Sequence, residues 1–578
     1  MFAITSPSVV LVAVATASLG AYLYQRLVHL RWRQYAHLPQ PCRASLLWGH
    51  LRFMGEADAA VNKSRWSDAS DEMWFNIFHD AGNPEILLAD FRPLMMPLLV
   101  VQSHAVAEQI SRQSKLMPYG APKKYMLDYL EPLVGKHSII KVNGHEWKDL
   151  RRRFNPGFAP QHLLSLMPVI TDKCKDLLAK LDDSARTGEV CTLGPLFIDL
   201  TFDIIGAVAA GIEFRAQGTP EEQHPIVSTY VQLLKTYSHH SGTLPWWAEP
   251  HVRWRRRGLQ RKVDGYLHDH VVEEFRKLKA GGEAGRDVLG LSFHDLDELT
   301  PDIIDETADQ IKSFLFAGHD TTSKILQWAV FEISRHPRVL EAVRAEVDAA
   351  LGTDPDPLSV LRAFNTHADD IFRALPYTAA VFRETLRRHT TAGTGRYIPR
   401  GSGFNITLRD GRMLCLDGVT VFLCHDLIML DEEVYGPTTW DFVPERWVTD
   451  EQAQAAMARA RTDEERRVTR EARATEVPAS SFRPFERGPR NCIGQELSLI
   501  EGRIILALLI RQYDFAKVDV GAATSGEDGK PLVDAKGRHI SETEPWGIRK
   551  GTSGLMDGIK IKVSVREGFE KRCEDRYI

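Results

Sequence analysis

Cysteine is scarce in this sequence and forms no recognisable motif. The chain has 578 residues and seven cysteines, and no pair of them has the C-x-x-C spacing. The cysteines are Cys42, Cys174, Cys191, Cys415, Cys424, Cys492 and Cys573. An odd and scattered set argues against both a disulfide framework and a structural zinc site. We therefore expect the folded body to occupy a reducing compartment.

The sequence also lacks a strong excess of charge of either sign. Its formal net charge is -5 and its pI is near 6.5, so it offers no positive field that would attract phosphate backbones. Nucleic acid is therefore not an expected partner. Hydrophobic residues make up 43% and charged residues 26% of the chain, which is typical of a folded protein. The length allows several domains, although one large core is also compatible with it.

Charged side chains are absent from Ile4 to Tyr24, a run rich in Val, Leu and Ala. At helical rise this run is long enough to cross a hydrocarbon core of about 30 Å. Arg26, Arg31 and Arg33 follow it, which predicts a luminal N-terminus and a cytosolic body. A cleaved signal peptide is the alternative, but the run is longer than a typical signal core and has no basic residues before it. We expect a transmembrane anchor over residues 1–25.

The rest of the chain divides into a short flank, 26–50, and a body, 51–578. The flank is basic and contains the proline hinge Leu38-Pro39-Gln40-Pro41. Apolar residues at helical spacing dominate the body. They predict helices over Gln161–Leu181, Val263–Ala280, Pro301–Arg335, Arg338–Leu351 and Tyr377–Arg388. Alternating patterns that predict strands are concentrated around Gly403–Phe422 and near Ile559–Val565, so the expected fold class is mainly α with a small β component.

Two segments of the body resemble insertions. Thr449–Glu476 is dense in Ala, Arg and Glu and has few large apolar residues, which predicts a solvated helix that adds little to the core. Gly521–Gly551 is rich in Gly, Asp and Lys, which predicts a long surface loop.

The strongest local motif is Phe485-Glu486-Arg487-Gly488-Pro489-Arg490-Asn491-Cys492-Ile493-Gly494. Gly488 and Gly494 permit a tight turn in which backbone amides point at a sulfur anion. A buried structural cysteine in a glycine-rich loop is the alternative. The shape of the loop alone does not decide between them.

This motif resembles the haem-binding loop of the cytochrome P450 family, F-x-x-G-x-R-x-C-x-G, at every fixed position. The resemblance implies the P450 fold and a haem b cofactor, iron protoporphyrin IX, with Cys492 as the axial thiolate ligand of the iron. It also implies that Arg490 pairs with a haem propionate, that Phe485 packs near the sulfur, and that Gly494 belongs to the cofactor-binding loop.

A second motif, Glu384-Thr385-Leu386-Arg387, lies in the predicted helix Tyr377–Arg388. A Glu and an Arg three residues apart share a helix face and are usually a surface pair. Here they are followed by Pro444-Glu445-Arg446-Trp447 and then by the cysteine loop, in the order found in the same family. The resemblance implies a buried charge network of Glu384, Arg387 and Arg446 that supports folding. Family members more often have Phe in the place of Trp447.

A third motif, Ala317-Gly318-His319-Asp320-Thr321-Thr322, lies in the middle of the helix predicted over Pro301–Arg335. A glycine there costs the helix about 1 kcal/mol relative to alanine. A kink with Thr321 bonded to its own backbone is one explanation. The family resemblance implies another, in which Gly318 opens space for dioxygen and the pair Asp320 and Thr321 relays protons.

Weaker matches complete the site. Trp147 and Arg151 resemble the family's W-x-x-x-R helix, which contacts haem propionates, and Arg396 occupies the place of another propionate-binding arginine; each is alternatively an ordinary surface residue. Ser498 stands where the family usually has Ala. The family frequently has His-Arg where this chain has Met429-Leu430. One contact, to a haem propionate or to the meander (the irregular segment before the cysteine loop), is therefore in doubt.

The resemblance implies a haem-thiolate monooxygenase that inserts one atom of O2 into a lipophilic substrate, with a secondary metabolite such as a terpenoid or polyketide as the expected class. The chain has no dinucleotide-binding glycine fingerprint, so the electrons would come from NADPH-cytochrome P450 reductase, with cytochrome b5 as a further donor. A basic docking face on the cysteine side is one interpretation of Lys148, Arg151–Arg153, Arg483 and Arg487, and a plain solvated or propionate-binding role for each of them is an equal alternative. The expected location is the endoplasmic reticulum membrane, single-pass, with the catalytic domain in the cytosol.

Two other functions stay open. One is an oxygen-independent haem-thiolate isomerase or dehydratase, against which the intact Asp320 and Thr321 pair counts. The other is a non-catalytic haem sensor. Oxygen-dependent consumption of NADPH would distinguish the monooxygenase from both.

Overall fold

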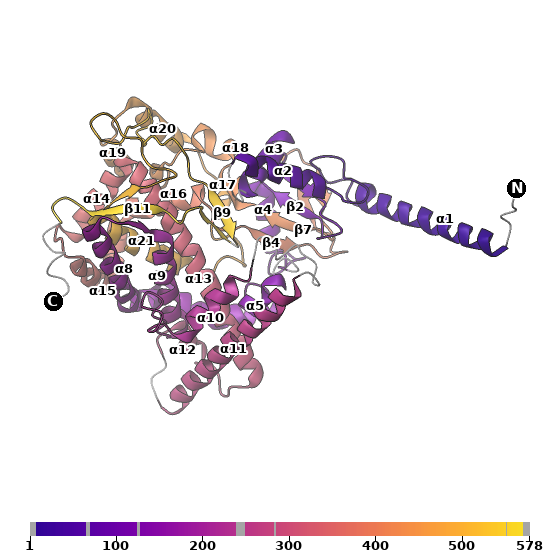
Figure 1. Cartoon of the computed structure of the whole chain (residues 1–578), viewed down its shortest axis with the longest axis horizontal. Helices are drawn as coiled ribbons and strands as arrows, with labels where there is room; N and C mark the ends of the chain where they lie inside the picture. The colour runs from indigo at the N-terminus through magenta and orange to yellow at the C-terminus, as the bar shows by residue number, and fades with distance from the viewer. Residues whose placement is uncertain are drawn as a thin grey trace.

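The computed structural model describes residues 7–64, 70–123, 128–237, 249–281, 285–550 and 552–569. It is a mainly helical body with small sheets, from which one long helix projects (Figure 1). This agrees with the fold class predicted from the sequence. Ile4–Ser6, Gly551 and Cys573 lie outside the described residues.

The helices have the following bounds. In the N-terminal half they are α1 (Pro7–Val28), α2 (Leu51–Ser64), α3 (Ser70–Asp80), α4 (His104–Ser111), α5 (Glu131–Val134), α6 (Gly144–Phe154), α7 (Pro160–Ser165), α8 (Met167–Thr187), α9 (Leu193–Ala210), α10 (Pro225–Leu234), α11 (Pro250–Lys279) and α12 (Val288–Ser292). In the C-terminal half they are α13 (Pro301–Arg335), α14 (Pro337–Leu351), α15 (Pro357–Ala374), α16 (Pro376–Arg388), α17 (His425–Met429), α18 (Glu432–Tyr435), α19 (Asp450–Met457), α20 (Asp463–Ala474) and α21 (Gln495–Gln512). Short turns of other helix types include η1 (His29–Arg33) and η5 (Pro444–Trp447).

Helix α13 is the central element of the body. Its bounds are those predicted: the Thr300 hydroxyl accepts a hydrogen bond from the Ile303 amide, and Pro301 occupies the first turn. It packs against α9, α11, α16 and α21, so its middle is enclosed by other helices. The helices predicted over Arg338–Leu351 and Tyr377–Arg388 are present as α14 and α16.

Strands are short and, in the part of the chain that the structure describes, form four small sheets. They are β1 (Ile86–Ala89), β2 (Leu98–Val101), β3 (Val190–Thr192), β4 (Thr394–Tyr397), β5 (Asn405–Thr407), β6 (Met413–Cys415), β7 (Thr420–Leu423), β8 (Tyr513–Lys517), β9 (Gly547–Lys550), β10 (Thr552–Leu555) and β11 (Lys560–Val565). The largest sheet has the order β1-β2-β7-β4, in which β2 and β7 are parallel. The hairpin β10-β9 places β10 against α13.

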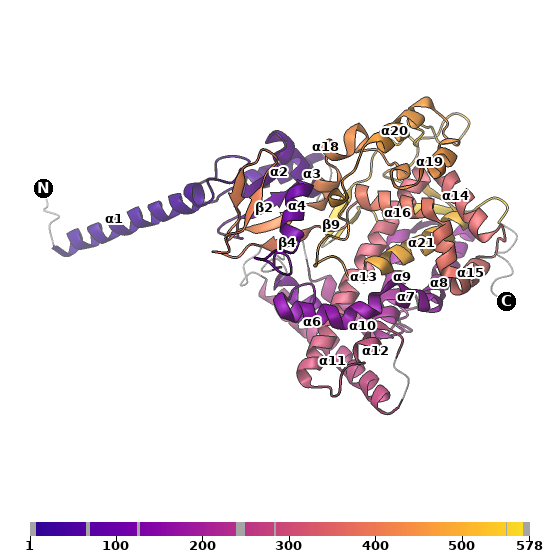
Figure 2. The same cartoon turned by 180° about the vertical axis from the view of Figure 1, so that it is seen from behind.

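Helix α1 extends away from the body in both views (Figures 1 and 2). A candidate membrane span covers Ser8–Arg33, and none of its apolar window is buried in the protein. A second apolar helix, Leu193–Ala210, is 78% buried and is therefore core helix α9 rather than a span.

The prediction for Thr449–Glu476 is wrong in one respect. The segment forms two helices, α19 and α20, but α20 does not merely lie in solvent. Val468 and Ala472, one turn apart, pack with Val443 in a small buried cluster. Few apolar residues were expected to mean little burial, yet two small ones on one face of α20 are enough to bury that face.

The prediction of a surface loop after Gly521 agrees with the structure over most of its length. Described residues there are mostly half-buried or exposed and are joined by isolated bridges such as Ala523 to Ser541. The last residues, Gly547–Lys550, are instead strand β9. That both segments are insertions stays a prediction.

Candidate functional site

The cysteine loop makes a tight turn immediately before α21. The Cys492 amide donates a 2.9 Å hydrogen bond to the carbonyl of Phe485. Gly488 has a φ of +76°, and a Cβ there would lie 2.3 Å from the backbone oxygen of Ser111. A larger residue at position 488 would therefore be strained in its backbone and would also collide with the end of α4.

The protein around the Cys492 sulfur acts on its charge in two opposing ways, and on balance the pKa of the thiol is raised. Burial raises the pKa of the Cys492 thiol, and a hydrogen bond from the Gly494 amide and the charges of Arg151 and Lys123 act to lower it. The predicted contribution of a loop amide is therefore present, at the glycine two residues after the cysteine. Arg151, on α6, also holds the loop: its guanidinium donates to the Asn491 carbonyl at 2.9 Å and to Asn491 Oδ1 at 3.1 Å.

Arg396 is the clearest sign that a further anionic group belongs here. It lies on β4 with a relative exposure of 1%, and none of its three guanidinium nitrogens has a hydrogen-bond partner among the described residues. The nearest carboxylate oxygen, Glu486 Oε2, is 3.8 Å from Arg396 Nη2. Buried guanidinium groups without partners are costly, so a group with anionic oxygens would satisfy them.

Arg490 and Trp147 lie together in the same region. The Arg490 guanidinium carbon is 4.7 Å from the centre of the Trp147 ring, and its Nη2 donates to the Val142 carbonyl at 2.9 Å. Burial and the charges of Arg396 and Arg151 lower the pKa of Arg490 to about 9. The mutual repulsion of these arginines is what the two propionates of a haem would relieve, so the residues present fit that cofactor.

The predicted charge network is present and fully buried. Arg387 Nε and Nη2 donate to the two Glu384 carboxylate oxygens at 2.9 and 2.8 Å. Arg446 Nε lies 3.5 Å from Glu384 Oε1, and its side chain is 1% exposed. Arg387 also donates to the backbone carbonyls of Thr439 and Asp441. The network therefore joins α16 to the segment that leads into η5.

The middle of α13 carries Asp320 and Thr321 with defined partners. The Thr321 hydroxyl donates to the Ala317 carbonyl at 2.7 Å, as the local explanation predicted. Lys324 Nζ lies 2.9 Å from Asp320 Oδ2, which also accepts a hydrogen bond from the Thr552 hydroxyl. Asp320 is therefore held between its own helix and β10.

Gly318 has a packing role that the sequence did not indicate. A Cβ at this position would lie 2.6 Å from Ile205 Cγ1, on α9. The glycine therefore allows α9 and α13 to approach closely. Its role in making space for dioxygen stays a prediction.

Three other residues extend the site beyond the motifs. Lys324 is four residues after Asp320, a spacing that could have identified it. Thr552 follows Asp320 by 232 residues and carried no such signal. The ring nitrogens of His425 are buried without hydrogen-bond partners among the described residues, and His425 Nε2 lies 3.5 Å from Glu486 Oε2.

Two departures from the family pattern have structural consequences. Ser498 accepts a 3.3 Å hydrogen bond from the Thr322 hydroxyl, so it connects α21 to α13. The Met429 sulfur accepts a 3.4 Å hydrogen bond from the Arg483 amide, and the Met429 carbonyl accepts one from Arg387. Met429 therefore takes part in the meander through its backbone and its sulfur.

The predicted basic docking face is wrong for Arg483. Its side chain is 0% exposed, with ion pairs to Glu108 and Glu486. Arg153 pairs with Glu306 and is 15% exposed, so it also is largely withdrawn. The sequence could not reveal these partners, because Glu108 and Glu306 come from distant parts of the chain. Exposed Lys148 and Arg152 remain available on α6.

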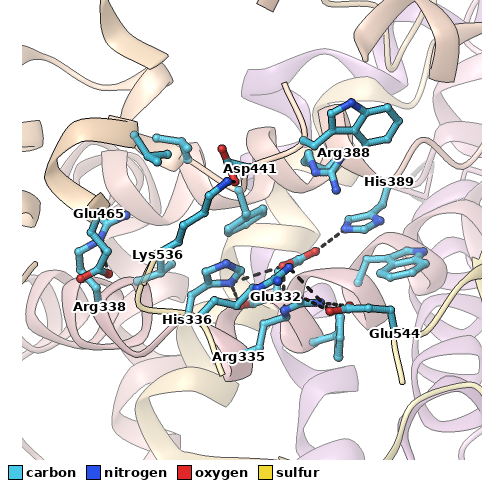
Figure 3. A pocket seen from close by; sticks show the side chains of 18 of the residues that line it. Glu332, Arg335, His336, Arg338, Arg388, His389, Asp441, Glu465, Lys536 and Glu544 are labelled. Atoms are coloured by element: carbon cyan, nitrogen blue, oxygen red, sulfur yellow. Dashed lines mark hydrogen bonds and ion pairs between the residues drawn. The ribbon is translucent and has the colours of Figure 1, made fainter. Parts of the chain in front are cut away.

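A well-defined pocket lies elsewhere, between the C-terminal end of α13 and the loop after Gly521 (Figure 3). None of the predicted cofactor-binding or catalytic residues lines it. Its charged side chains mostly pair with one another: His389 Nε2 lies 2.7 Å from Glu332 Oε1, and Lys536 Nζ lies 2.6 Å from Asp441 Oδ1. This pocket is therefore separate from the candidate site around Cys492.

Comparisons with known proteins show the family of the chain. The chain matches the family model described as Cytochrome P450 over residues 88–529. A protein named cytochrome P450 monooxygenase acrF, from Aspergillus aculeatus, is 30% identical over 483 residues, which cover 81% of this chain and 90% of that protein. Cytochrome P450 monooxygenase polC, from Polytolypa hystricis, is 26% identical over 511 residues, covering 83% of this chain and 82% of that protein.

Two further matches concern the fold and the electron donor. The solved haem domain of cytochrome P450DA has a TM-score of 0.65 to this chain at 17% identity, covering 92% of this chain and 97% of that structure. A bifunctional cytochrome P450/NADPH--P450 reductase from Alternaria alternata is 25% identical over 437 residues, which cover 72% of this chain but only 34% of that protein. The first match shows the fold alone.

Proposed function

The chain belongs to the cytochrome P450 family and is a monooxygenase of that family, and from this premise we propose that it inserts one atom of O2 into a lipophilic secondary metabolite. A terpenoid or a polyketide is the expected class of substrate. Electrons come from a separate NADPH-cytochrome P450 reductase, with cytochrome b5 as a further donor. The Alternaria relative has both parts in its name, which supports reductase as the donor class.

Haem b bound through a thiolate supplies iron whose electron density favours cleavage of the O–O bond. In this proposal Cys492 holds the iron, and Arg396, Arg490, Arg151 and Trp147 hold the propionates. The single observation that carries the proposal is Arg396, whose three guanidinium nitrogens have no hydrogen-bond partner among the described residues. A buried cation without a close partner destabilises the fold, so binding of an anionic ligand explains its presence better than a structural role does.

Asp320 and Thr321 move and hold protons at the reacting oxygen in this mechanism. The Thr321 hydroxyl is a donor and an acceptor, so it can hold a water molecule in place. Asp320 exchanges protons through its carboxylate. The ion pair to Lys324 holds that carboxylate on the face of α13 that packs against β10. Asp320→Asn should slow oxygen activation, because an amide cannot cycle a proton in this way.

The proposed location is the endoplasmic reticulum membrane, with α1 as a single span and the body in the cytosol. The 22 residues of α1 are long enough to cross the hydrocarbon core. Deleting Met1–Tyr24 should release much of the protein from membranes and leave haem binding intact. Complete pelleting of the truncated protein after high-salt washing would contradict the anchor.

Spectroscopy tests the assignment of the site. Reduced protein with carbon monoxide should show the red-shifted Soret band of a thiolate-ligated haem, and Cys492→Ser should lose it. Cys415→Ser is the matched control, because it removes a thiol from a different region. Retention of the band in Cys492→Ser would overturn the assignment. Comparing metabolites made with and without the protein would then identify the substrate.

A further inference from the structure

The base of the anchor helix is fixed to the body by a buried arginine. Arg31, in η1, has a side chain that is only 4% exposed and forms a 2.8 Å ion pair with Asp90. Its Nε donates to the Leu46 carbonyl, and its Nη2 donates to the carbonyls of Leu47 and Arg92. In the sequence Arg31 is one of the basic residues that follow the apolar run, and the structure places its side chain inside the protein.

Arg92 strengthens the same contact from the other side. It forms two 2.8 Å hydrogen bonds to the Asp90 carboxylate and donates to Gln34 Oε1 at 2.9 Å and to the Leu30 carbonyl. Asp90 therefore joins one arginine from the helix to one from the turn after β1. Buried charged groups in such a network resist separation, because losing one member leaves the others unpaired.

The neighbouring turn at Gly49 packs directly against this contact. Gly49 has a φ of +57°, and a Cβ there would lie 2.3 Å from the Asp90 carbonyl and 2.7 Å from Arg31 Nη1. Trp32 Nε1 donates to the Ala44 carbonyl at 2.8 Å. The helix end, the turn at Gly49 and the turn at Arg92 are thus packed as one unit.

Two turns of this unit expose large apolar side chains. Leu47 is 60% and Trp48 is 57% exposed in the first turn, and Leu94 is 50% and Met96 is 39% exposed in the second. The two turns are neighbours, because the Arg31 guanidinium bonds a carbonyl from each. Both views place β2, the strand that follows the second turn, beside the base of α1 (Figures 1 and 2).

The depth of this patch follows from helical rise. Seven residues separate Tyr24, the end of the uncharged run, from Arg31, which is about 10 Å along the helix axis. That distance places Arg31 close to the outer edge of the polar interface, because core and interfaces together are about 40–45 Å thick. Trp is enriched at this level because its ring is apolar and its N–H needs a polar partner.

We propose that the Arg31–Asp90–Arg92 contact holds the body at one orientation to the membrane, with Leu47, Trp48, Leu94 and Met96 seated in the bilayer interface. The inference rests on the proposed membrane anchoring. It adds that the anchor and the body move together, so that the body does not swing freely about the prolines at 39 and 41. In support, the Leu88 amide donates to the Pro39 carbonyl at 2.7 Å, which ties this stretch to β1.

The orientation is testable with the full chain, loaded with haem, in oriented phosphatidylcholine bilayers. Polarised absorption of the Soret band measures the tilt of the haem. Wild-type protein should show clear dichroism, and Arg31→Gln should lose most of it. Arg33→Gln is the matched control, because Arg33 is exposed on the same turn. Retained dichroism in Arg31→Gln would overturn the proposal.

Two checks separate other outcomes. The carbon monoxide spectrum of each variant reports whether it is folded. If Arg31→Gln is misfolded, the triple variant Arg31→Gln/Asp90→Asn/Arg92→Gln removes all three charges of the contact together, so none of them is left unpaired, and it should likewise lose dichroism. If wild-type protein failed to pellet with phosphatidylcholine vesicles, the anchor itself would be wrong, which is a different result from binding to the membrane without dichroism.

The apolar patch is tested by quenching of tryptophan fluorescence with acyl-brominated phosphatidylcholine. Replacing Trp48 with Phe should lower the quenched fraction relative to wild type. Trp440→Phe serves as a control that removes another half-exposed indole. An unchanged quenched fraction in Trp48→Phe would mean that the patch does not meet lipid, and it would overturn the proposed seating.

Discussion

The indole Nε1 of Trp447 donates a 2.8 Å hydrogen bond to Oε2 of Glu384, inside the buried charge network. The phenylalanine that the family more often has at this position could not donate. Glu384 thereby gains a neutral donor in addition to Arg387 and Arg446. The aromatic difference that looked conservative in the sequence is a difference in hydrogen bonding.

Trp447→Phe should lower the stability of the protein. It leaves a buried carboxylate with one donor fewer, which costs about 1.5–3 kcal/mol for a hydrogen bond to a charged group. The urea concentration at which the thiolate-haem absorbance is half lost should fall accordingly.

Trp440→Phe is the control for this change. The Trp440 indole also donates to a carboxylate, Glu432 Oε1 at 3.0 Å, but both groups are exposed. The expected loss is below about 0.5 kcal/mol, since surface substitutions usually have small effects. Equal midpoints for the two variants would contradict a special role for the buried contact.

Local signals in the sequence predicted those parts of the fold that depend on neighbouring residues. Thr300-Pro301 and His336-Pro337 gave both ends of α13, because caps and prolines act within one turn. The cysteine loop was also predictable, since Gly488 is needed by the turn itself. Contacts between distant segments were not: nothing near Asp320 indicates Thr552, and nothing near Arg31 indicates Asp90. The buried face of α20 was missed because small residues give a weak apolar signal.

Gly318→Ala should destabilise the protein by about 1–3 kcal/mol, the usual cost of overpacking. The added methyl would meet Ile205, 2.6 Å away. Ile205→Val in the same chain should recover part of the loss. Gly265→Ala is the control, because nothing lies within 4 Å of a Cβ there, and it should be neutral or stabilising. If Gly318→Ala were as stable as Gly265→Ala, close approach of α9 and α13 would not explain the glycine.

His336 should make stability depend on pH. Burial, with Arg335 and Arg338 nearby, lowers its pKa from 6.5 to about 4, although Glu332 opposes the shift. The unfolded chain therefore binds a proton that the folded chain does not between these values. The contribution, roughly 3 kcal/mol, is complete above pH 6.5 and is lost as the pH falls towards 4.

The free energy of unfolding measured from pH 7 to pH 4 checks this expectation. His336→Gln should reduce the slope between pH 6.5 and 4, because glutamine does not titrate. His294→Gln, at a residue whose side chain is 88% exposed, should leave the slope unchanged. An identical slope in His336→Gln and wild type would assign the acid sensitivity to other groups.

Thr321→Ala tests proton delivery separately from cofactor binding. The Thr321 hydroxyl bonds only the Ala317 carbonyl among the hydrogen bonds described for it, so its loss should leave the fold and the thiolate spectrum intact. If the hydroxyl positions a proton donor at the reacting oxygen, product formed per NADPH should fall by roughly one to two powers of ten, the scale of general acid catalysis. Hydrogen peroxide in solution should rise in proportion. Thr322→Ala removes the adjacent hydroxyl, which faces Ser498 instead, and should keep most of the coupling. Product, peroxide and NADPH measured in one reaction separate these cases, and full coupling in Thr321→Ala would leave the hydroxyl with only its local role in the helix.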